Sequence, residues 1–91
     1  MTYMLCHNHV SDFSKWKAVF DSHGDAHRNA GLVLRHIWRD VEDPNEIFFL
    51  FEVESIEKAN GFIHSEESAK AGAEAGVIDG KYHYVEDVEV G

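Results

Sequence analysis

The chain has 91 residues, 44% of them hydrophobic and 12% aromatic, which suits one compact domain (residues 1–91) and argues against a disordered segment. Its formal net charge of −9 opposes binding to phosphate backbones, so we expect no nucleic-acid partner. A single cysteine excludes an internal disulfide, and without a leader or a long apolar run we expect a cytoplasmic protein with no membrane partner.

The first half of the sequence predicts a strand, a helix and a second strand. Residues 2–10 (TYMLCHNHV) alternate in the manner of a strand. Over 13–30, apolar and histidine side chains recur at intervals of three and four residues, which predicts one amphipathic helix. Those side chains are Phe13, Trp16, Val19, Phe20, His23 and His27. Gly31 ends the helix, and residues 32–40 (LVLRHIWRD) predict the second strand.

The second half predicts a strand, an interrupted helical region and a last strand. A turn (VEDPNE) precedes the strand at 47–53 (IFFLFEV), and Ser55 caps a short helix at 56–64. Ser65 caps a second helix at 66–75, and residues 79–90 form the last strand. The order β-α-β-β-α-β is that of an α+β protein with the ferredoxin-like split βαβ fold and a four-stranded antiparallel sheet.

The apolar side chains of the predicted sheet indicate that the chain pairs with a second copy of itself. Two helical regions can cover only one sheet face, yet IFFLFEV carries large apolar side chains at both parities, including Phe48 and Phe49. A partner subunit would bury the uncovered face. We therefore expect a homodimer.

Several segments together resemble the dimeric α+β barrels of the antibiotic biosynthesis monooxygenase type. These are VSDFSKWKAVFDSH, RNAGL, DPNEIFFLFEVES and EKANGFIHSEESAKAGAEAGV, which span nearly the whole chain. The resemblance implies a dimeric barrel with a pocket between sheet and helices. The family includes oxygenases, cyclases, haem-degrading enzymes and members without known activity, so the resemblance leaves the reaction open. The haem-degrading branch carries an Asn late in the first strand, which Asn8 matches, but also a Trp and a His where this chain has Phe62 and Gly72. We therefore expect no haem, and because the sequence has no Gly-rich phosphate-binding loop we expect no other cofactor.

The histidines leave three interpretations open. His23 and His27 lie one helical turn apart, so they could be core-edge side chains, metal ligands or proton-handling groups in a pocket. No HExxH motif or cysteine pair supports a metal, and we expect none. Of the two, the apolar stripe predicts that His23 points inward and that His27 lies at the mouth or on the surface. His7 and His9 share the strand face opposite Asn8, where a dimer would gather four histidines.

The predicted site is a mostly apolar cavity that binds a small apolar or aromatic ligand. Trp16, Phe20, Phe49 or Phe48, and Tyr82 would contact the ligand, with His23 as base and Asn8 as hydrogen-bond donor. With the family resemblance, this predicts a cofactor-free oxygenase or a cyclase that acts on an aromatic or polyketide-like substrate. The alternatives are a non-catalytic ligand-binding dimer and a histidine-rich metal-binding dimer.

Overall fold

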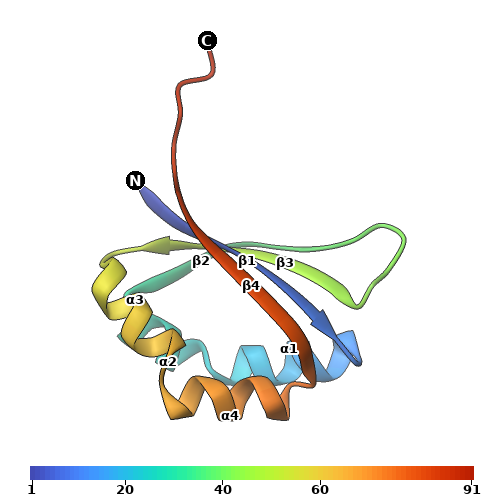
Figure 1. Cartoon of the computed structure of the whole chain (residues 1–91). Helices are drawn as coiled ribbons and strands as arrows, with labels where there is room; N and C mark the ends of the chain where they lie inside the picture. The colour runs from blue at the N-terminus through green and yellow to red at the C-terminus, as the bar shows by residue number, and fades with distance from the viewer.

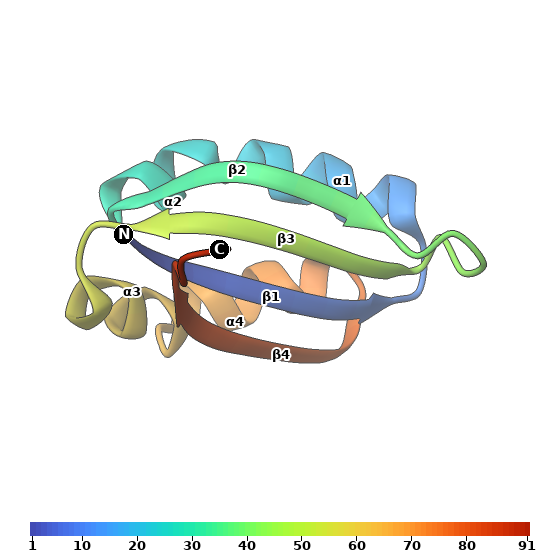
Figure 2. The same ribbon diagram turned by 90° about the horizontal axis from the view of Figure 1, so that it is seen from above.

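The computed structural model describes all 91 residues and forms a two-layer α+β fold. Its elements are β1 (Thr2–Val10), α1 (Phe13–Ser22), α2 (Gly24–Asn29), β2 (Leu32–Arg39), β3 (Glu46–Val53), α3 (Ile56–Ile63), α4 (Glu66–Glu74) and β4 (Val77–Glu86). The four strands form one antiparallel sheet in the order β2-β3-β1-β4. All the helices lie against one face of this sheet (Figures 1 and 2). The predicted fold class is confirmed.

The helix predicted over 13–30 is two helices. Asp12 caps α1 by accepting a hydrogen bond from the backbone N–H of Lys15 at 2.9 Å, as expected of an N-cap residue. α1 then ends at Ser22, and His23 adopts φ −101° and ψ 16°, outside the helical range. The chain resumes as α2 at Gly24, a residue with low helix propensity.

No helix of the protein is both long enough and apolar enough to cross a membrane.

The core lies between the sheet and the helices, and strand alternation selects its members. β1 turns Met4, Cys6 and Val10 toward the helices, and all three are buried. β3 buries every second residue, and the core also contains Leu32 of β2, Trp16 of α1 and Ala59 of α3. The buried β3 residues are Ile47, Phe49, Phe51 and Val53. Phe49 thus belongs to the helix side, and Phe48 lies on the other face.

The opposite face of the sheet has no helix over it. We call it the open face; among its side chains Val33 is 47% exposed and Trp38 is 45% exposed. An irregularity in the β2–β3 pairing between Leu34 and His36 disturbs the alternation of β2. As a result His36 stacks on Trp38 at 4.8 Å on the open face, which sequence parity could not assign.

The chain beyond β4 leaves the sheet. The last strand starts two residues earlier than predicted, at Val77, and ends at Glu86 instead of Val90. Residues 87–91 project away on the side opposite the helices (Figure 1). They make no strand pairing within the chain, since the β1–β4 pairing ends at Glu86. Val88 and Val90 in this tail are 80% and 98% exposed.

Candidate functional site

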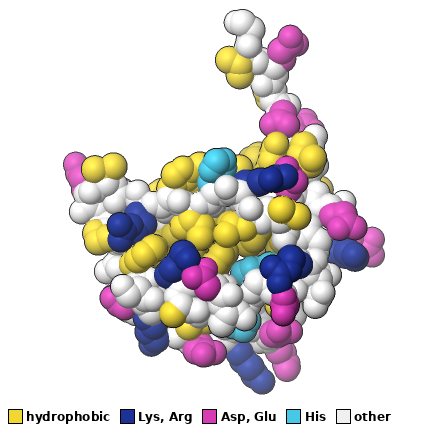
Figure 3. All heavy atoms as spheres, turned by 180° about the vertical axis from the view of Figure 1, so that it is seen from behind, with side chains coloured by type: hydrophobic (Ala, Val, Ile, Leu, Met, Phe, Trp, Pro, Cys, Tyr) yellow, Lys and Arg dark blue, Asp and Glu magenta, His cyan; other side chains and the backbone are white.

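A cavity of about 330 Å³ lies between the helix-covered face of the sheet and the helices. Fourteen of its 21 lining residues are hydrophobic, so the cavity suits an apolar molecule. Its size falls at the lower end of small-molecule sites, which span about 300–1,000 Å³. In the space-filling view from behind, hydrophobic atoms are visible in a hollow at the centre of the molecule, with histidine atoms close by (Figure 3).

Every residue predicted for the site lies on the wall of this one cavity. These are Asn8 from β1, Trp16 and Phe20 from α1, His23 from the junction of α1 and α2, Phe49 from β3 and Tyr82 from β4. The alternative residue Phe48 lies on the open face. Their placement brings the six side chains together, while their chemical roles stay predictions.

One wall is built from stacked aromatic rings. Trp16 is 2% exposed and stacks on Phe20, with ring centroids 4.7 Å apart. Phe49 contacts both rings, at 5.5 Å from Trp16 and 5.2 Å from Phe20. Aromatic pairs at these separations attract through their quadrupoles as well as through buried area. The wall is therefore a preformed, rigid surface against which a planar ligand could lie.

Asn8 brings an amide into this apolar surrounding. It is half-buried and pairs across the strands with Gly80 of β4. A Cβ at position 80 would lie 2.9 Å from Asn8 Oδ1, closer than real Cβ contacts come. Gly80 therefore leaves the space that the Asn8 amide occupies, and this amide can both donate and accept hydrogen bonds.

The structure reverses part of the prediction for the two histidines. His27 is not a mouth or surface residue, because it packs against Phe20 at 4.8 Å, Phe51 at 5.1 Å and Phe62 at 5.6 Å. Burial lowers the pKa of His27 to about 4, with smaller contributions from the positive charges of His23 and Arg28. The helix break at His23 explains the error, since the pattern was projected along one continuous helix. His27 is thus a neutral imidazole at pH 7.

His23 lies where the cavity meets the surface. It lines the cavity, as predicted, and also borders a polar surface hollow lined by Ser22, Asp25 and Lys58 among others. Its backbone N–H donates to the Phe20 carbonyl at 3.1 Å, which fixes the end of α1. His23 can therefore reach both a bound ligand and water, and a group that exchanges protons needs both.

Cys6 of β1 and the two tyrosines of β4 lie on the sheet side of the site. Burial raises the pKa of the Cys6 thiol to about 12, so Cys6 stays protonated and behaves as a core residue. The Tyr82 hydroxyl lies 3.5 Å from His64 Nε2, while Tyr84 donates a 2.7 Å hydrogen bond to Asn60 Oδ1. These contacts tie β4 to α3 and its end. Tyr82 is 37% exposed, which places it at the edge of the cavity.

Sequence reasoning missed the part of the wall that α3 and α4 supply. Phe62 and Ile63 come from α3, and Ala71, Gly72 and Ala75 come from α4 and its end. The α4 residues at the cavity have small side chains, which leave room for it between the helices and the sheet. The run of small residues was the available signal.

Known structures share this architecture. A candidate antibiotic biosynthesis monooxygenase from Bordetella bronchiseptica superposes with a TM-score of 0.79 over 97% of each chain, at 13% identity. An antibiotic biosynthesis monooxygenase matches with a TM-score of 0.72 and 15% identity, over 98% of this chain and 100% of its own. A NIPSNAP domain protein from Burkholderia xenovorans matches with a TM-score of 0.70 and 7% identity, over 97% of this chain and 95% of its own.

These similarities concern the fold. No family model matches the sequence, and no curated protein matches it. At 15% identity or less, the matched structures establish a shared backbone arrangement, whereas the side chains of the cavity are this chain's own. The chain therefore has the ferredoxin-like α+β fold found in proteins of the antibiotic biosynthesis monooxygenase type.

Proposed function

We propose that the cavity binds a small aromatic or polyketide-like molecule and that the protein acts on it as a cofactor-free oxygenase or a cyclase. The observation that carries this proposal is the combination of an aromatic wall with three polar side chains, Asn8, His23 and His27, on one cavity. A purely apolar cavity would favour a ligand carrier without turnover. The likeness to monooxygenase-type structures directs the choice of chemistry and does not establish it.

The proposed oxygenase step starts with proton removal. A phenolic substrate that loses its proton to His23 becomes electron-rich enough to pass an electron to O₂, and the Asn8 amide stabilises the developing oxyanion. For 1-naphthol, one oxygen atom of O₂ becomes a ring carbonyl, the other leaves as water, and a naphthoquinone remains. An intramolecular aldol cyclisation makes the same two demands.

His27 has a different role in this proposal. A general base works best when its pKa lies near the working pH, and a pKa of about 4 makes His27 a weak base at neutral pH. It stays uncharged in the aromatic wall and presents one donor and one acceptor nitrogen. We assign it to orienting the substrate, while His23 exchanges the proton.

We also propose that the protein works as a homodimer through the open face. This face carries exposed Val33 and Trp38 on β2 and exposed Val85 on β4. The tail at 87–91 leaves the sheet on the same side, with Val88 and Val90 exposed (Figure 1). An apolar sheet face and a projecting extended segment are together what a second copy of the chain would cover.

The activity is tested with 1-naphthol as probe, by following O₂ uptake and by chromatography of the products. We expect uptake above the uncatalysed rate, reduced about 10²-fold or more in H23A, the range of a lost general base, and reduced also in N8A. H83A changes an exposed histidine of β4 and should match the unmodified protein. Binding without O₂ uptake or a new product would make the protein a ligand-binding dimer, and equal activity in H23A and H83A would remove His23 from the mechanism.

A further inference from the structure

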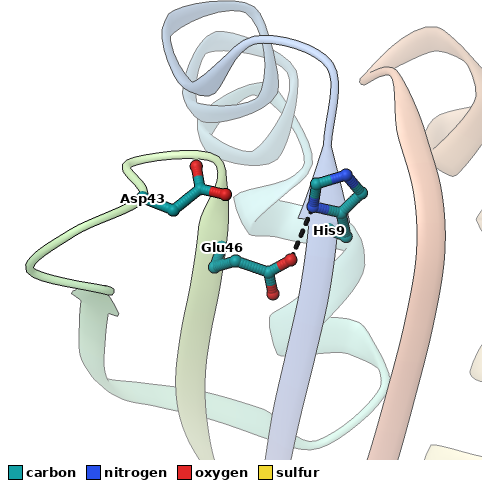
Figure 4. A group of neighbouring side chains, drawn as sticks. All are labelled: His9, Asp43 and Glu46. Carbon is teal, nitrogen blue, oxygen red and sulfur yellow. Dashed lines mark ion pairs between the residues drawn. The ribbon is translucent and has the colours of Figure 1, made fainter.

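A second cluster of donor side chains lies on the open face, on the other side of the sheet from the cavity. It consists of His9 near the end of β1, Glu46 at the start of β3, and Asp43 in the turn before β3 (Figure 4). Their ligand atoms all lie within 4.8 Å of one another. The β1–β3 register places His9 directly opposite Glu46, which is why two residues 37 positions apart meet.

We propose that His9, Asp43 and Glu46 bind a divalent transition-metal ion, with Zn²⁺ as the reference ion. One imidazole nitrogen and two carboxylates form a donor set that Zn²⁺ accepts, at about 2.0–2.2 Å from each donor. Donors arranged tetrahedrally at that distance lie roughly 3.4 Å apart. His9 Nδ1 and Glu46 Oε1 are 2.6 Å apart, so an ion would enter as these two side chains move slightly apart and the Asp43 side chain rotates in its exposed turn.

The His9 nitrogen that faces Glu46 has one polar neighbour. Nδ1 itself is shielded from solvent and makes no hydrogen bond, and Glu46 Oε1 lies 2.6 Å from it as an ion-pair partner (Figure 4). A cation between the two side chains would give the nitrogen lone pair and the carboxylate a shared partner.

The local charge also favours a cation. Residues 40–46 (DVEDPNE) carry four acidic side chains and no basic one. The preceding Arg39 forms no ion pair with them, and its guanidinium lies over the Phe13 ring at 4.5 Å. One oxygen of Asp43 accepts a hydrogen bond from the Asn45 backbone N–H at 3.0 Å, which holds the turn and leaves the second oxygen available.

His7 supports Glu46 from the other side. Its Nε2 contacts Glu46 Oε2, and its ring stacks on Phe48 with centroids 4.2 Å apart and planes 17° apart. An imidazole that holds a metal-binding carboxylate in place is a common feature of metal sites. His7 is therefore a positioning residue in this proposal. All the donors come from one chain, so the site needs neither the dimer nor a ligand in the cavity.

Isothermal titration of tag-free, chelator-treated protein with ZnSO₄ tests the proposal. We expect about one Zn²⁺ per chain and proton release that depends on the buffer, because the imidazole must be deprotonated to bind. H9A and E46Q should each weaken binding roughly tenfold or more. H83A removes another open-face histidine and should leave the affinity unchanged. At one fixed Zn²⁺ concentration, Tm should rise for the unmodified protein and H83A, and should rise less for H9A and E46Q.

Two results would overturn the proposal. One is no stoichiometric Zn²⁺ binding by the unmodified protein. The other is an equal loss of affinity in H9A, E46Q and H83A, which would indicate diffuse binding to a histidine-rich surface. If H9A does not fold without metal, E46Q decides, because Gln keeps the size of the side chain. The O₂-uptake assay on E46Q separates this site from the proposed cavity function, which should survive the substitution.

Discussion

At the residue scale, His27 is the side chain whose chemistry the fold changes most. Three phenylalanine rings surround it, and burial lowers its pKa to about 4. An unfolded chain has a histidine pKa of about 6.5, so below that pH the unfolded state takes up the proton first. The contribution of His27 to stability is complete above pH 6.5 and is lost as pH falls toward 4.

This predicts a loss on the order of 1–2 kcal/mol between pH 7 and pH 4 that belongs to His27. A fully shielded group would give about 3 kcal/mol, and partial exposure reduces that value. H27F keeps an aromatic ring in the wall and should remove this part of the pH dependence, whereas H83F should retain it. Urea unfolding across that pH range measures the difference. An NMR titration midpoint for His27 at or above 6 would contradict the burial described here.

The sequence predicted the positions of some of these side chains and missed others. Alternation in β1 places Asn8 on the side of Met4 and Cys6, and the structure confirms that this side faces the helices. The prediction that His27 lies at the mouth or on the surface was wrong, because helical periodicity assumes a continuous axis and α1 ends at Ser22. The His9–Glu46 contact could not be predicted, since it depends on strand register.

At the element scale, the junction between α4 and β4 is fixed to the end of β1. Gly76 ends α4 with φ +77°, and its carbonyl accepts a hydrogen bond from the Ser11 backbone N–H at 3.0 Å. This contact joins the end of β1 to the start of β4.

The sequence could predict which face of a strand is buried where one set of alternating residues is polar. It could not do so in β3, where both sets are apolar, or in β2, where the pairing is irregular.

Alanine at two glycines should therefore have opposite effects. G76A places a Cβ 2.4 Å from Ser11 Oγ in a left-handed backbone conformation, which should cost about 1–2 kcal/mol. G61A lies inside α3 with nothing within 4 Å of the new Cβ, and should stabilise by about 0.5–1 kcal/mol. Urea denaturation gives both values. A neutral G76A would mean that the α4–β4 junction is described incorrectly.

At the scale of the whole molecule, adjacent phenylalanines separate folding from assembly. Phe49 is 8% exposed in the core, so F49D buries an unpaired carboxylate at a cost of several kcal/mol and should unfold the protein. Phe48 lies on the open face and is half-buried, so F48D should keep the fold and yield a monomer. Circular dichroism reports the fold, and light scattering reports the mass. An F48D dimer as stable as the unmodified one would place the interface elsewhere.

Binding in the cavity between sheet and helices is the central claim, and the two tryptophans test it directly. Trp16 lies in the cavity wall and is 2% exposed, whereas Trp38 is 45% exposed on the open face. In a ¹H–¹⁵N NMR titration with 1-naphthol, with the two indole signals assigned through W38F, the Trp16 signal should shift saturably and the Trp38 signal should stay in place. A saturable shift of Trp38 alone, or no shift of either signal, would contradict the account.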